Sequence, residues 1–232
     1  MLTSAGARRA LVWIAAIASA VSAAMIVFYV PNDRVQGVVQ RIFYFHLALA
    51  WVAYLAFFLV LVASVVYLVS RDLRWDAFAR ASAELGVLFT TLVLIVGSLW
   101  GKPIWNTWWT WDPRLTTTLV LWFIYVAYLM LRAYTPDVER GARFGAILGI
   151  VGFVDVPIVH FSVQWWRSLH PDPVFARSDP QLPTPMIVTL LVTIAAMTLV
   201  FCALLTYRTM LERMRDDNRA LEDDEVGERV YA

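Results

Sequence analysis

Six long apolar segments, separated by short polar connections, dominate the pattern of hydrophobic and polar positions along the chain. A helix that crosses a bilayer needs about 20 mainly apolar residues, and these segments have the composition of such helices. The sequence therefore predicts an all-α polytopic membrane protein, a six-transmembrane-helix bundle forming a single domain over residues 1–232. The predicted helices cover approximately residues 10–30, 42–70, 85–100, 113–131, 144–163 and 186–207.

Glycine, proline and aspartate set the expected helix ends and contacts. Gly101 suits the end of a helix and Pro103 cannot continue one, so the third helix is expected to end near residue 100. Asp112 followed by Pro113 predicts the start of the fourth helix, because Asp caps free N–H groups and Pro needs no hydrogen bond there. Glycines at every fourth residue of the fifth helix predict close approach of a neighbouring helix, at Gly141, Gly145 and Gly149.

Acidic residues near and within the apolar segments have modest expected roles. Asp155, two residues before Pro157, is expected to be a satisfied structural group beside a proline kink, with a proton path as the alternative. Glu84 lies at the entry to the third helix and needs no special role. The charged tail, residues 208–232, is predicted to be a solvated amphipathic helix, with a contact to a cytoplasmic partner as the alternative.

Composition agrees with a membrane protein and excludes several functions. Of the 232 residues 60% are hydrophobic and 16% charged, which an ordinary soluble domain could not keep away from water. The net charge of +1 gives no indication of nucleic-acid binding. The single cysteine, Cys202, excludes an internal disulfide, a Cys-x-x-Cys redox pair and a cysteine-ligated cluster. The first apolar segment has no clear cleavage site and is expected to remain as a helix.

The distribution of Lys and Arg predicts the orientation in the membrane. Thirteen of the 19 lie at the N-terminus, in the second and fourth connections, or in the tail. Because cytoplasmic connections carry an excess of positive charge, both termini are predicted to be cytoplasmic and the other connections external. The six on the external side are Arg34, Arg41, Lys102, Arg114, Arg167 and Arg177.

A tryptophan-rich connection over residues 100–116 has the sequence W-G-K-P-I-W-N-T-W-W-T-W-D-P-R-L-T. It holds five of the 11 tryptophans of the chain. Tryptophan often anchors a helix at the membrane surface, but an ordinary anchor needs fewer rings. We therefore expect an external platform for a flat, mostly apolar ligand, built from Trp100, Trp105, Trp108, Trp109 and Trp111.

Three histidines are predicted to lie on the same side as this connection. His46 begins the second helix, His160 is near the end of the fifth, and His170 is in the next connection. Neutral imidazole is a common metal ligand, and two imidazoles can hold a haem iron from opposite faces. Arg41 and Arg114 flank the region, and a guanidinium binds a carboxylate through two parallel hydrogen bonds. An apolar plane, a metal and two propionates are the features of haem, so the pattern favours a haem site.

These residues resemble the tryptophan-rich (WWD) haem-handling family of cytochrome c maturation, and within it the haem exporter subunits called CcmC. The resemblance covers about residues 41–207 and includes the tryptophan-rich connection. It also includes R-I-F-Y-F-H at residues 41–46 and P-I-V-H-F-S-V-Q-W-W-R-S-L-H at residues 157–170. Pro113 stands where the family pattern leads us to expect a small residue.

The resemblance implies a role and a set of partners. Such proteins hold haem b transiently at the outer face of the cell's cytoplasmic membrane and deliver it to the periplasmic haem chaperone CcmE. They act with the ABC transporter subunits CcmA and CcmB and the small membrane subunit CcmD. By position, His46 and His170 match the axial ligands, and residues 100–112, ending at Asp112, match the haem platform. Arg41 and Arg114 match basic residues of the family motifs, and His160 is not carried over as a ligand.

Two other functions fit parts of the pattern. A small membrane b-type cytochrome could exchange electrons with a quinol, but such proteins usually place paired histidines at membrane depth on facing helices. A scaffold subunit could use its tryptophans to bind lipid or glycan. The sequence shows no clear catalytic group, so a transfer subunit is favoured over an enzyme.

Overall fold

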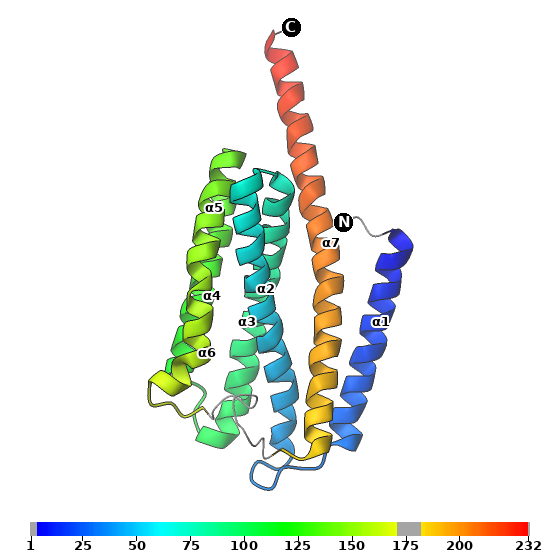
Figure 1. Ribbon diagram of the computed structural model, residues 1–232, viewed down its shortest axis with the longest axis vertical. Coiled ribbons are helices and arrows are strands. Elements are labelled where there is room, and N and C mark those ends of the chain that lie inside the picture. The colour runs from blue at the N-terminus through cyan, green and yellow to red at the C-terminus, as the bar shows by residue number, and fades with distance from the viewer. Residues whose placement is uncertain (1–3, 171–181, 232) are drawn as a thin grey trace.

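The computed structural model describes residues 4–170 and 182–231, apart from the side chains of residues 219, 220 and 222–231. Within these ranges the secondary structure is helical, and six helices are long and apolar enough to cross a membrane. The predicted six-helix bundle is therefore confirmed. Both chain ends lie toward one end of the bundle, and the tryptophan-rich connection lies at the opposite end, called the loop end below (Figure 1).

Short helical turns extend the first two spans, and the charged tail extends the last. The first span continues into a π-helical segment, and a 3-10 turn, η2, leads into the second. The elements are α1 (Ala5–Ala24), η1 (Met25–Tyr29), η2 (Val38–Arg41), α2 (Ile42–Ser70), α3 (Leu73–Trp105), α4 (Pro113–Tyr134), α5 (Val138–Phe153), α6 (Asp155–Trp165) and α7 (Thr184–Tyr231). Asp112 caps α4 and Pro113 is its first residue, as predicted.

The third helix is longer than expected at both ends: it begins at Leu73, within the stretch predicted as a basic connection, and Gly101 and Pro103 do not end it. Pro103 costs one hydrogen bond but lies in the last turns, and α3 ends only at Asn106, which has the left-handed backbone (φ 56°) typical of a helix end. Gly101 instead accommodates the ring of Trp105, since a Cβ there would be 3.0 Å from Trp105 Cε3. Trp100 and Trp105 are therefore held on a rigid helix and not in a loop.

The fifth span is broken into α5 and α6 at Val154. Asp155 is the first residue of α6 and is buried, but its Oδ2 atom has no hydrogen bond among the described residues. The expectation that this carboxylate is satisfied is therefore wrong. The expected proline kink corresponds to a break one residue before Asp155, because Pro157 favours the first turn of a new helix over the middle of an old one.

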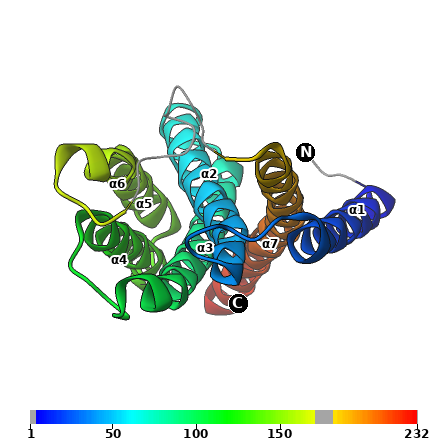
Figure 2. The same cartoon turned by 90° about the horizontal axis from the view of Figure 1, so that it is seen from below.

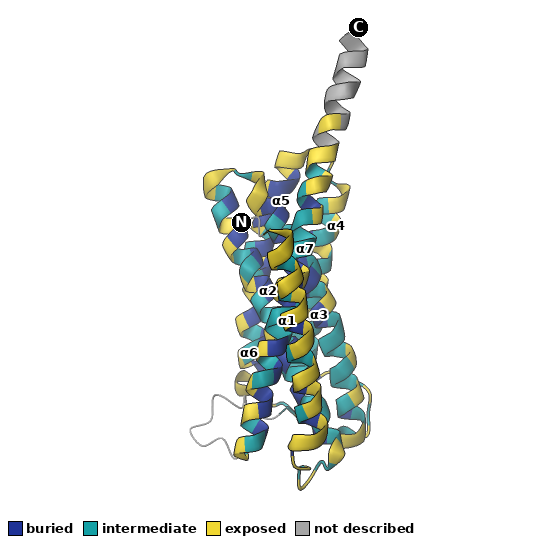
Figure 3. Ribbon diagram, turned by 90° about the vertical axis from the view of Figure 1, so that its right-hand side faces the viewer, coloured by how far each residue is buried: buried dark blue, intermediate teal, exposed yellow. Residues whose placement is uncertain are grey.

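The spans lie side by side in three groups: α1 with α7, α2 with α3, and α4 with the broken span formed by α5 and α6 (Figure 2). The predicted glycine contact is confirmed on α5. A Cβ at Gly149 would be 2.9 Å from Val60 Cγ1 of α2, and Tyr125 of α4 donates a hydrogen bond to the Gly149 carbonyl (3.1 Å). Phe57 stacks on Tyr125 with ring centroids 3.8 Å apart. In contrast, α1 is mostly exposed in the chain alone (Figure 3).

A buried ion network joins α3, α4 and α7 near the end of the bundle that holds the termini. Asp76 Oδ2 lies 2.7 Å from Arg132 Nη2 and 3.2 Å from Arg80 Nε. Arg80 reaches α7, where its Nη1 is 2.7 Å from Glu212 Oε2. Arg208 of α7 binds Glu84 of α3, with Nη2 2.6 Å from Oε1.

These contacts correct two expectations from the sequence. Glu84 has a structural role, because it pairs with Arg208 across two helices. The tail is not solvated along its whole length, since Glu212 is only 3% exposed and accepts from Arg215 (2.8 Å) within the network. The charges of residues 208–216 therefore fix α7 against the bundle.

Replacing Asp76 by Asn is expected to destabilise the protein by about 3–5 kcal/mol, because it leaves the buried cations Arg80 and Arg132 with less compensating charge. A lower midpoint of thermal unfolding in detergent would measure this. Asp72→Asn is the matched control, because Asp72 is a more exposed cap of α3 and Asn caps equally well. Equal midpoints for the two variants would contradict a stabilising role of the network.

Candidate functional site

His46 lies in the second turn of α2, at the loop end, and packs against α3. A Cβ added to Gly97 would be 3.0 Å from His46 Cε1, so this glycine makes room for the imidazole. The ring of Trp100 lies 5.7 Å from the imidazole, centroid to centroid. The Nδ1 atom of His46 is buried and has no hydrogen bond among the described residues. A buried nitrogen of this kind requires a partner that the described residues do not supply.

His170 is held by Asp112, the residue that also caps α4. Asp112 Oδ1 lies 2.9 Å from His170 Nδ1 and accepts from the Arg114 backbone N–H (3.0 Å). Its Oδ2 atom accepts from the Ser168 hydroxyl (2.8 Å) and the Leu169 N–H (2.7 Å). One carboxylate therefore fixes the start of α4 and the segment that carries His170.

The electrostatics of this pair determine which nitrogen of His170 carries the proton. Burial opposes ionisation of Asp112, but hydrogen bonds from Leu169 and Ser168 and the nearby His170 outweigh it, and the pKa of Asp112 is below its ordinary value. Burial also lowers the pKa of His170, against the opposing effect of Asp112. At neutral pH a neutral imidazole therefore faces an ionised carboxylate. Nδ1–H donates a hydrogen bond to Asp112, and the lone pair of Nε2 is free to bind a metal.

The five tryptophans do not form one flat surface. Trp100 and Trp105, on α3, face the two histidines, and the Trp105 ring meets His170 edge to face at 4.9 Å. Trp108 and Trp109 line a cavity between α3 and α4. Trp111 is 76% exposed and contacts Trp109 edge to face at 5.8 Å. Two of the predicted platform residues thus lie beside the histidines, and three lie in the following connection.

Both predicted arginines lie at the loop end with unused hydrogen-bonding capacity. Arg114 donates from Nη2 to the backbone carbonyl of His160 (3.0 Å), which joins α4 to α6. Arg41 donates from Nη2 to Asn32 Oδ1 (3.3 Å). The Nε atoms of Arg41 and Arg114 are buried and have no hydrogen bond among the described residues. Both guanidinium groups could therefore donate hydrogen bonds to an anionic group of a ligand.

The structure brings His46 and His170 into one region. His46 lies against Gly97 and Trp100 of α3, and His170 lies against Trp105, one turn further along the same helix. The ring of His160 packs on its neighbour Phe161 with centroids 5.0 Å apart, and only its carbonyl takes part in the site. The donor set, two imidazoles with indole rings and guanidinium groups around them, fits a metalloporphyrin with acidic side chains.

Three supporting residues were not found from the sequence. Gly97 makes room for His46, Gln36 accepts from the Trp100 indole N–H (3.2 Å), and Ser168 binds Asp112. The role of Ser168 could have been suspected from the sequence, since it lies two residues before His170 in a polar segment. The roles of Gly97 and Gln36 could not be recognised from the sequence, because they depend on contacts between distant parts of the chain.

The chain was compared with known proteins. Residues 2–223 match the family model described as CcmC, Heme exporter protein C. The chain is 37% identical over 193 residues to a protein named Heme exporter protein C from Bradyrhizobium diazoefficiens, covering 83% of this chain and 73% of that protein.

Two further relatives carry the same name. The Haemophilus influenzae protein is 36% identical over 190 residues, covering 82% of this chain and 77% of its own. The Escherichia coli K12 protein is 37% identical over 160 residues, covering 68% of this chain and 65% of its own. With this family match over nearly its whole length, the chain belongs to the CcmC, or Heme exporter protein C, family.

Proposed function

We propose that this membrane protein binds haem b at the loop end, between His46 and His170, for cytochrome c maturation. The observation that carries the proposal is the contact of Asp112 with His170, because it leaves Nε2 of a neutral imidazole free for iron. The buried Nδ1 of His46, which has no partner among the described residues, supports a second ligand on α2. The name shared by the relatives supports haem as the ligand.

Each part of the site would serve one part of haem. His46 and His170 would hold the iron, and Trp100 and Trp105 would pack against the porphyrin and exclude water. Arg41 and Arg114 would bind the propionates, since their guanidinium groups have unused donors. Haem supplies the visible absorption by which binding can be followed. The chain itself orients and releases its ligand, and no bond chemistry is assigned to its residues.

The cellular context follows from the same proposal. The protein would lie in the cytoplasmic membrane with both termini inside and the loop end outside, as the Lys and Arg distribution predicts. It would deliver haem to the periplasmic chaperone CcmE, acting with CcmA, CcmB and CcmD. Trp111, Trp165, Trp166 and Leu169 are exposed at the loop end, where a partner could contact them.

Haem transfer to a purified soluble domain of CcmE is the direct test. The full chain, loaded with haem in detergent, is mixed with that domain, and the two are separated and their haem absorption recorded. We expect haem to move to CcmE from the wild type. Haem that stays on the chain would contradict delivery. Rapid reduction of the haem by an added quinol, with no transfer to CcmE, would favour electron transfer instead.

A further inference from the structure

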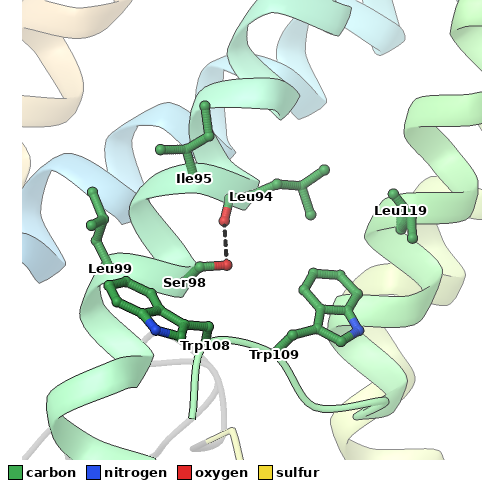
Figure 4. Close-up of a pocket in the computed structure, with 7 residues that line it drawn as sticks. All are labelled: Leu94, Ile95, Ser98, Leu99, Trp108, Trp109 and Leu119. Carbon is green, nitrogen blue, oxygen red and sulfur yellow. Dashed lines mark hydrogen bonds between the residues drawn. The ribbon is translucent and has the colours of Figure 1, made fainter.

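A cleft with a volume of about 510 Å³ opens between α3 and α4, on the side of α3 that faces away from the bundle core (Figure 4). Its walls are apolar, and two indole rings close it toward the loop end. Its size lies within the ~300–1,000 Å³ range of sites for small organic ligands. The cleft is lined chiefly by Leu94, Ile95, Leu99, Leu119, Trp108 and Trp109.

The cleft lies between two helices long and apolar enough to cross a membrane, and part of its wall is exposed in the described part of the chain. Ile95 is 52% exposed and Leu99 is 50% exposed, both on a helix long enough to cross the membrane. The hydroxyl of Ser98 donates to the Leu94 carbonyl (2.9 Å), so it adds no free polar group to the wall. An apolar chain is therefore the chemistry that fits the interior.

The loop end of the cleft has a positive charge. Lys102 lies one helical turn beyond Ser98 and Leu99, on the same face of α3. Its Nζ lies 5.9 Å from the centre of the Trp108 ring and donates to the Asn106 carbonyl (3.1 Å). No carboxylate among the described residues is paired with it. The buried Trp109 Nε1 donor also has no hydrogen bond in the described part of the chain.

We propose that this cleft binds one phospholipid of the leaflet at the loop end. An acyl chain fills the apolar cleft, and the phosphate meets Lys102. An ammonium at the membrane surface attracts anionic headgroups, and indole rings favour this interfacial depth. An apolar interior with one cation at its loop end matches the order of groups along a phospholipid.

The bound lipid would lie next to the candidate haem site, on the side of Trp108 and Trp109 away from the histidines. Trp108 and Trp109 also line a small hollow whose other walls include Gly97, Gly101 and Trp105. Gly97 contacts His46 and Trp105 contacts His170, so the two indoles separate the lipid from the histidine side. The lipid therefore holds these indoles in place without touching the proposed haem ligands.

The test uses the full chain purified from membranes in mild detergent. Retained phospholipid is measured by mass spectrometry after extensive washing, in the wild type, Leu119→Trp and the matched control Val120→Trp. Leu119 lines the cleft, whereas its neighbour Val120 is 46% exposed and does not. We expect one strongly held phospholipid in the wild type and the control, and a loss of about tenfold or more in retention when the cleft is filled.

Lys102→Met tests the headgroup without changing the cleft. After delipidation, added phosphatidylglycerol is expected to raise the thermal midpoint of the wild type more than that of Lys102→Met. This comparison decides the matter if Leu119→Trp does not fold. Equal retention by Leu119→Trp and Val120→Trp, equal responses of wild type and Lys102→Met, or one-for-one displacement of the lipid by added haem would overturn the proposal. The last outcome would assign the cleft to haem.

Discussion

His170→Ala is expected to reduce the haem retained by the purified chain below one tenth of the wild-type amount. Loss of a group that merely supports a metal ligand costs about 10–100-fold in affinity, and removal of the ligand itself should cost at least as much. His46→Ala is expected to have the same effect, because His46 would hold the iron from α2. The Soret absorbance per chain measures both.

The third histidine supplies a matched control. The ring of His160 packs on Phe161, and only its backbone carbonyl binds Arg114, so His160→Ala should keep the wild-type spectrum. Added imidazole should partly restore haem binding to His170→Ala, because it can enter the space that the side chain leaves. Wild-type haem content in both His46→Ala and His170→Ala would remove the ligand assignment.

The helices could be predicted because their causes are local. The range expected for the second span, residues 42–70, is the range of α2, since a continuous apolar run sets both ends. Asp112 and Pro113 likewise determine the start of α4 without help from other elements. The helix end predicted at Pro103 was wrong because the hydrogen bond that proline removes costs little stability in the last turns of a helix. Trp105 also packs over Gly101 there.

The site could be predicted only as a set of residue types. The histidines, tryptophans and arginines were evident from the sequence, and the structure places His46 and His170 against neighbouring turns at the end of α3. Which tryptophans face the histidines was not predictable, because it depends on how far α3 extends. The pairing of Glu84 with Arg208 was also hidden, since 124 residues separate the two and only the packing of α3 on α7 brings them together.

Asp112→Asn is expected to weaken haem binding by about 10–100-fold while leaving the fold intact. The carboxylate accepts four hydrogen bonds, from Arg114 N–H, Ser168, Leu169 N–H and His170. An amide keeps one acceptor oxygen and replaces the other by a donor. Because Asn caps a helix as well as Asp does, α4 should still begin at Pro113. The segment at residues 168–170 should lose its anchor.

The variant should also change the spectrum of the haem that remains bound, because His170 would no longer be fixed with Nε2 directed toward the iron. Asp137→Asn is the matched control: Asp137 caps α5 by accepting from the Arg140 N–H (2.8 Å), and it is distant in the fold from the loop end. If Asp112→Asn and Asp137→Asn bind haem with equal affinity and equal spectra, Asp112 acts only as a helix cap. A selective loss in Asp112→Asn would show that one carboxylate both starts a helix and positions a ligand.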